Sequence, residues 1–60
     1  MSPEDMVQEL YDEVLYGGLG VTQWEESFIN DVYEKAWEED RELTDLQKEK
    51  VEEIYERYLG

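Results

Sequence analysis

The chain has 60 residues, of which 18 are acidic and five are basic, so its formal net charge is −13. We expect residues 1–60 to form a single domain, because a chain of this length has room for only one small hydrophobic core. It contains no Cys and no His, which excludes disulfide bonds, thiolate metal sites and imidazole-based catalysis.

The first predicted element is a helix over residues 3–16. Ser2 is a suitable N-cap, a proline follows at the first helical position, and Met1 is spaced to pack against Met6 across the helix start. Apolar side chains fill about half of the helical wheel. The opposite side carries Asp5, Glu9, Asp12 and Glu13. Tyr16, the last residue, falls on that acidic side.

Three glycines, Gly17, Gly18 and Gly20, follow this helix and precede the next one. Glycine-rich turns before a helix can bind phosphate through backbone N–H groups and the helix dipole. This turn follows a helix rather than a strand and has no Lys or Arg near it, because residues 1–34 hold nine acids and no base. We therefore expect an ordinary helix C-cap and turn, with Gly17 or Gly18 in the left-handed conformation, and no phosphate site.

A capping box from Thr22 to Glu25 begins the second predicted helix, over residues 23–40. Its apolar side chains spread over roughly 220° of the wheel, more than a helix packed against one neighbour needs. They are Trp24, Phe28, Ile29, Val32, Tyr33, Ala36 and Trp37. Either this helix lies between the other two, or one edge of it meets a partner.

A second capping box, from Thr44 to Gln47, begins the third predicted helix, over residues 45–59. The apolar side consists of Leu46, Val51, Ile54, Tyr55, Tyr58 and Leu59, with Leu43 from the preceding turn. A face of roughly 100° carries five acids and no base. These acids are Asp45, Glu49, Glu52, Glu53 and Glu56. Three amphipathic helices with short connections predict an all-α protein, a compact three-helix bundle.

No apolar run approaches the roughly 18 residues that cross a membrane. The first residues, M-S-P-E-D, also lack the basic start of a signal peptide. We expect a soluble cytoplasmic protein with no membrane partner.

The carboxylates do not form a recognisable catalytic or metal site. The two serines, Ser2 and Ser27, have no base to activate them, and a small bundle has little interior in which the pKa of a carboxyl group could be shifted. No calcium-binding loop is present, and acids on regular helix can hold divalent ions only weakly. We expect no enzymatic activity, no cofactor and no specific metal site.

The acids repeatedly stand four residues apart on the predicted helices, where like charges cost a few tenths of a kcal/mol per pair. The pairs are Glu9 with Glu13, Glu34 with Glu38, Asp45 with Glu49, Glu49 with Glu53, and Glu52 with Glu56. Two explanations remain open: general solubility or adaptation to a salty cytoplasm, and display of negative charge to a basic partner. The protein cannot bind nucleic acid directly with so few Lys and Arg residues.

The segments W-E-E-S-F-I-N-D-V and L-T-D-L-Q-K-E-K-V-E-E-I-Y-E-R-Y resemble a two-helix pattern found in small proteins and accessory modules of tailed bacteriophages. The resemblance covers residues 22–58 and consists mostly of caps and core positions. The phage versions often carry more Lys and Arg around the second helix of the pattern, and no catalytic residue carries over. The resemblance implies a context in which small acidic proteins inhibit host restriction, CRISPR or recombination nucleases.

The sequence therefore predicts a protein-binding module that imitates DNA and inhibits or modulates a DNA- or RNA-binding protein by occupying its basic surface. It would act in the host cytoplasm if a phage encodes it. The candidate partner-binding residues are Glu9, Glu13, Tyr16, Trp37, Asp45, Glu49, Glu52, Glu53 and Glu56. The main alternative is a structural or adaptor module that forms a homodimer through the wide apolar face of the second helix. A third is an accessory domain of a larger functional unit.

Overall fold

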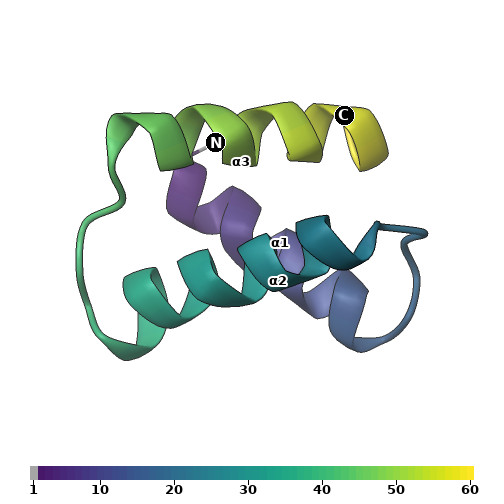
Figure 1. Ribbon diagram of the computed structural model, residues 1–60, viewed down its shortest axis with the longest axis horizontal. Helices are drawn as coiled ribbons and strands as arrows, with labels where there is room; N and C mark the ends of the chain where they lie inside the picture. Colours follow the sequence, from purple (N-terminus) through teal and green to yellow (C-terminus); the bar gives the residue numbers. More distant parts are fainter. Residues whose placement is uncertain (1) are drawn as a thin grey trace.

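A computed structural model describes residues 2–60, which form three α-helices and no strand (Figure 1). The elements are α1, Pro3–Leu15; α2, Gln23–Tyr33; the π-helical segment η1, Glu34–Glu38; and α3, Asp45–Tyr58. The predicted all-α three-helix bundle is confirmed. Over the described residues, none of the helices combines the length and the apolar character needed to span a bilayer.

Both predicted capping boxes are confirmed. The hydroxyl of Thr22 accepts a hydrogen bond from the N–H of Glu25 at 3.1 Å, and the Glu25 carboxylate accepts one from the N–H of Thr22 at 2.9 Å. Thr44 and Gln47 make the same reciprocal pair at 3.2 and 2.9 Å. Each box satisfies backbone donors that the helix itself leaves open, so the start of each helix is encoded locally.

The first helix begins as its sequence predicts. The Ser2 hydroxyl accepts a hydrogen bond from the N–H of Asp5 at 3.3 Å, and a proline occupies the first helical position. The predicted contact between Met1 and Met6 lies outside the described residues, which begin at residue 2.

The glycine turn closes α1. Gly17, the residue after the cap, has a φ of +71°, the left-handed conformation expected at that position. Its N–H donates to the Val14 carbonyl at 3.1 Å, and the N–H of Gly18 donates to the Glu13 carbonyl at 2.9 Å. The helix therefore ends at residue 15, one residue before its predicted end, with Tyr16 as the cap.

The second helix differs from the predicted continuous span of residues 23–40. Its α-helical part ends at residue 33 and its last turns, residues 34–38, are π-helical. The N–H of Arg41 donates to the Lys35 carbonyl at 2.8 Å, and Asp40 has a φ of 53°. Asp tolerates the left-handed region better than most residues, and here it turns the chain toward α3.

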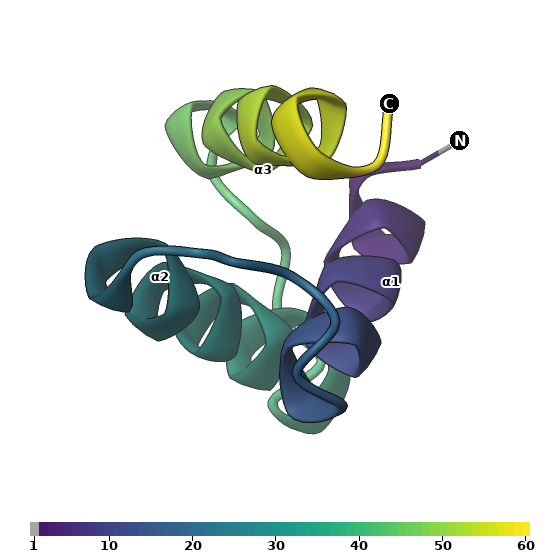
Figure 2. The same ribbon diagram turned by 90° about the vertical axis from the view of Figure 1, so that its right-hand side faces the viewer.

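The core lies where α1 packs against both other helices (Figure 2). Its buried side chains are Val7, Leu10, Ile29, Val32, Leu43, Val51 and Ile54. Contact between α2 and α3 is less extensive than the contact of either helix with α1. Of the two alternatives for the second helix, the one that places it between the other two is therefore wrong, because α1 holds that position. The side of the α2–α3 pair away from α1 has no helix covering it (Figure 2).

Four large side chains from the predicted apolar faces are exposed instead. Leu15 is 65% exposed, Trp24 57%, Trp37 45% and Leu46 79%. Leu15 lies in the last turn of α1 and Leu46 in the first turn of α3, at helix ends where there is less neighbouring helix to pack against. Trp24 lies in the first turn of α2, on the flank facing the sparsely packed α2–α3 boundary.

Candidate functional site

The outer face of α3 carries four of the predicted carboxylates. Asp45, Glu49, Glu52 and Glu56 are all exposed. The helical period places them opposite the buried core residues of the same helix. No Lys or Arg side chain among residues 2–60 forms an ion pair with any of the four. These carboxylates therefore have no internal counter-charge in contact with them.

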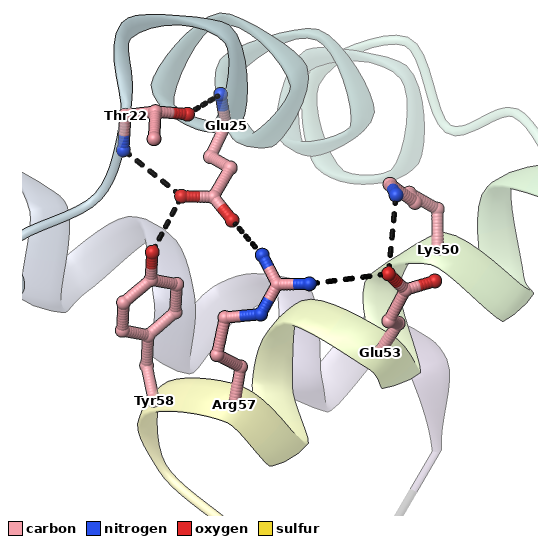
Figure 3. Close-up of polar contacts among 6 residues, drawn as sticks. All are labelled: Thr22, Glu25, Lys50, Glu53, Arg57 and Tyr58. Carbon is pink, nitrogen blue, oxygen red and sulfur yellow. Dashed lines mark hydrogen bonds and ion pairs between the residues drawn. The ribbon is translucent and has the colours of Figure 1, made fainter.

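Glu53 is different from the other acids of α3. One of its carboxylate oxygens lies 3.3 Å from Lys50 Nζ and 3.3 Å from Arg57 Nη2 (Figure 3). The expectation that no base accompanies this group of acids is therefore wrong at Glu53. The wheel assigns both basic residues to the apolar margin of α3, but their long side chains extend from that margin to the carboxylate.

Glu9 and Glu13 lie in a groove between α1 and α3. The groove has a volume of about 460 Å³, and its lining residues are Glu9, Asp12, Glu13, Tyr55 and Leu59. The Tyr55 hydroxyl donates a hydrogen bond to Glu9 at 2.7 Å. This bond to a carboxylate is the main reason why the pKa of Tyr55 is raised above its usual value. The same hydrogen bond links Glu9 of α1 to Tyr55 of α3.

The groove and the outer face of α3 adjoin one another. Glu52 and Glu56 each stand three residues before a groove-lining residue of α3, Tyr55 and Leu59 respectively, and residues three apart are neighbours on a helix surface. We call the combined surface the acidic face. It consists of Glu9, Asp12, Glu13, Asp45, Glu49, Glu52 and Glu56.

The two candidate aromatic anchors, Tyr16 and Trp37, are not brought together. Tyr16 is 85% exposed at the C-terminal end of α1. Trp37 is 45% exposed, and its indole N–H donates to the backbone carbonyl of Glu4 at 3.2 Å, near the opposite end of α1. A helix of this length is about 20 Å long, so the two side chains belong to separate regions. Tyr16 is free for a partner, whereas Trp37 has a structural contact.

The sequence reasoning missed a buried polar cluster around Glu25 (Figure 3). Only 3% of Glu25 is exposed. Besides closing its capping box, its carboxylate accepts hydrogen bonds from the Tyr58 hydroxyl at 2.6 Å and from Arg57 Nη1 at 2.7 Å. The cluster therefore joins the start of α2 to the end of α3. A signal was present, because Glu25 stands four residues before Ile29, on the buried side of the wheel.

The charge of Glu25 is stabilised where it lies. The pKa of its carboxyl group is lowered, chiefly by the hydrogen bond from the Thr22 backbone, then by the Tyr58 hydroxyl, with a smaller contribution from Arg57. Burial acts in the opposite direction. The hydrogen bond between Tyr58 and Glu25 also raises the pKa of the Tyr58 hydroxyl, because an ionised Tyr58 could no longer donate it. These contacts indicate that the cluster stabilises the fold.

The acidic face offers charge rather than a reactive group. Within residues 2–60 no three acidic side chains are arranged to hold a metal ion. No protein family, curated protein or solved structure shows a significant match to this chain. The function is therefore argued from the chemistry of the surface.

Proposed function

We propose that the acidic face binds the basic surface of a DNA- or RNA-binding protein and there replaces the nucleic acid. The observation that carries this proposal is that, among the described residues, no Lys or Arg forms an ion pair with a carboxylate of the acidic face. Within residues 2–60 the paired bases instead contact Glu25, Glu39, Glu42 and Glu53. The negative charge of the acidic face is left for a partner to neutralise.

The spacing of the carboxylates supports imitation of nucleic acid. Carboxylates four residues apart on a helix are separated by a rise of about 6 Å, while phosphates follow one another at about 3.4 Å along each DNA strand. The acids of α1 that line the groove add to those of α3 and raise the density of charge toward that of DNA. Such a surface steers a basic partner to fast association that weakens as salt increases.

The resemblance of residues 22–58 to phage helical modules indicates which partners to examine first. These are the host restriction, CRISPR and recombination nucleases, whose nucleic-acid channels are basic. Tyr16 adds an exposed aromatic ring that can contribute affinity, because aromatic side chains are enriched among the residues that dominate binding energy.

The test compares two triple variants with the same change in net charge. The first, Glu49→Gln, Glu52→Gln and Glu56→Gln, removes three carboxylates from the acidic face. The control, Glu26→Gln, Asp31→Asn and Glu34→Gln, removes three exposed carboxylates from α2 and η1. Both should fold, because Glu and Gln have similar helix propensities and all the positions changed are exposed.

Each protein is immobilised and exposed to a bacterial lysate at low salt, and the retained proteins are eluted first with duplex DNA and then with RNA and identified by mass spectrometry. We expect the wild type and the control to retain nucleic-acid-binding proteins that one of the two nucleic acids displaces, and the variant of the acidic face to lose them. Equal retention by both triple variants, or retention that neither nucleic acid disturbs, would contradict the proposal.

A further inference from the structure

A second surface lies on the side of α2 and α3 away from α1. We call it the α2–α3 seam. It consists of Trp24, Phe28, Asp31, Lys35, Leu46, Lys50, Glu53 and Arg57, with Asp31 three residues after Phe28 and four before Lys35 on the same side of the helix. Leu46 and Trp24, the two most exposed large apolar side chains of α3 and α2, both belong to it. Trp24 stacks on Phe28 with ring centroids 5.4 Å apart, and Lys50 Nζ lies 5.3 Å from the centroid of the Trp24 ring.

The seam is close to neutral although the chain carries a net charge of −13, because its bases are offset by Asp31, Glu53 and the buried Glu25 that pairs with Arg57. It contains Lys35, Lys50 and Arg57, three of the five basic residues of the chain. Glu53 is paired with two of them, and Lys35 donates a hydrogen bond to Gln47 at 3.0 Å. The seam therefore combines exposed apolar side chains with little excess negative charge.

We infer that the seam binds the seam of a second copy of this chain, around a two-fold axis. A basic partner would meet the lysines of the seam, so the partner of the acidic face is a poor occupant for this surface. Two copies that meet by their acidic faces bring unpaired carboxylates together, which costs free energy. A seam placed on the acidic face of another copy makes a heterologous contact that does not close into a dimer. When the two seams face one another, the same surface of each copy takes part, as an isologous contact requires. Trp24 and Leu46 of both copies are then covered, and both acidic faces remain exposed.

The area available implies a weak dimer. A standard interface buries about 800 Å² per partner, which is about a fifth of the 4057 Å² surface of this chain. The whole width of α2 and α3 must therefore take part, because two apolar side chains alone cannot supply that area. We expect dissociation constants on the order of 10 µM or weaker, the range of small interfaces.

Dimerisation through the seam and binding of a basic partner should respond to salt in opposite directions. Added salt screens the repulsion between two copies that each carry a charge of −13, so dimerisation should strengthen. Binding of a basic protein to the acidic face should weaken under the same conditions. The proposals for the acidic face and for the seam can therefore be tested independently of one another.

Sedimentation equilibrium of the full chain, from micromolar to millimolar concentration and at low and high salt, tests the inference. We expect a monomer–dimer equilibrium that shifts toward the dimer as salt increases. Leu46→Glu and Trp24→Gln should each weaken it at least ten-fold. Leu15→Glu is the matched control, since Leu15 is also exposed but lies on α1, and it should leave the equilibrium unchanged.

A concentration series of amide NMR spectra of the wild type provides a second measurement that needs no variant. The shifts that change on dilution should fall on α2 and α3 around residues 24, 28, 46 and 50. A protein that stays monomeric at millimolar concentration and high salt overturns the inference. So do dilution shifts that fall on α1, or equal weakening by Leu46→Glu and Leu15→Glu.

Discussion

At the scale of single residues, Glu25 shows how one side chain can act at two levels of structure. Its carboxylate completes a local cap with Thr22, and it also accepts bonds from Tyr58 and Arg57 on another helix. Removing one member of such a buried cluster leaves a remaining polar group without a hydrogen-bond partner. The resulting loss of stability is greater than the net contribution of the hydrogen bond. Glu25 is therefore the polar residue on which the packing of α3 against α2 most depends.

We expect Glu25→Gln to lower the free energy of unfolding by about 2 kcal/mol at pH 7. The pKa of Glu25 is lowered by folding, so its contribution is present above the ordinary value of 4.5 and is lost as the pH falls below it, through the lowered pKa. Urea unfolding at pH 7 and at pH 3 measures the effect. The difference between the variant and the wild type should be smaller at pH 3 than at pH 7. Glu26→Gln, which changes an exposed neighbour, should show no comparable loss at pH 7.

Substitution of the two candidate anchors, Trp37 and Tyr16, should change the stability of the protein by different amounts. Trp37→Ala removes a partly buried ring and its hydrogen bond to the Glu4 carbonyl, so thermal unfolding should show a loss of about 1–2 kcal/mol. Tyr16→Ala should change stability by less than about 0.5 kcal/mol, because the ring is 85% exposed. A large loss at Tyr16 would mean that its ring packs against the chain in solution.

At the scale of the elements, the helix starts are encoded by the capping boxes. Thr22→Ala and Thr44→Ala each remove the acceptor of one N–H, which should cost about 1 kcal/mol. The cost should be greater at Thr22, because its box also positions the buried carboxylate of Glu25, whereas the box of Thr44 is exposed. Chemical denaturation of both variants measures the difference. Unchanged midpoints in both would contradict the assigned helix starts.

At the scale of the whole molecule, the net charge of −13 opposes folding, because carboxylates repel one another in the compact state. The radius of gyration is 10.3 Å, and ions screen charge over about 10 Å at 0.1 M salt. Screening therefore acts across a distance comparable to the protein itself. The acidic face contributes to this cost because, within the part of the chain that the structure describes, its carboxylates have no paired Lys or Arg.

We expect the melting temperature at pH 7 to rise by about 5 °C or more between low and high concentrations of sodium chloride. Mild acidification toward pH 5 should also stabilise the protein, because it reduces the net negative charge. Thermal unfolding followed by circular dichroism at a fixed low protein concentration keeps any contribution from dimerisation small. A melting temperature that stays constant or falls as salt increases would show that the carboxylates are compensated locally.

The sequence by itself determined the helix class, the three helix starts and the glycine turn. These features depend on groups three or four residues apart, such as Thr22 with Glu25 or the left-handed Gly17 after the last turn of α1. It also determined that the outer acids of α3 would be exposed, because a face of ionised carboxylates cannot be buried without partners.

The tertiary structure alone decided which helix is central, which apolar residues are covered and which acids are paired. A helical wheel gives the direction of a side chain but not the position or the length of the neighbour it meets. For that reason the helical wheel assigns Leu46 and Trp24 to the apolar faces although they are exposed. For the same reason the partners of Glu25, which stand 32 and 33 residues further along the chain, could not be found by local spacing. Burial and ion pairing are decided by neighbours in space, and only the packing of α1 against α2 and α3 brings those neighbours together.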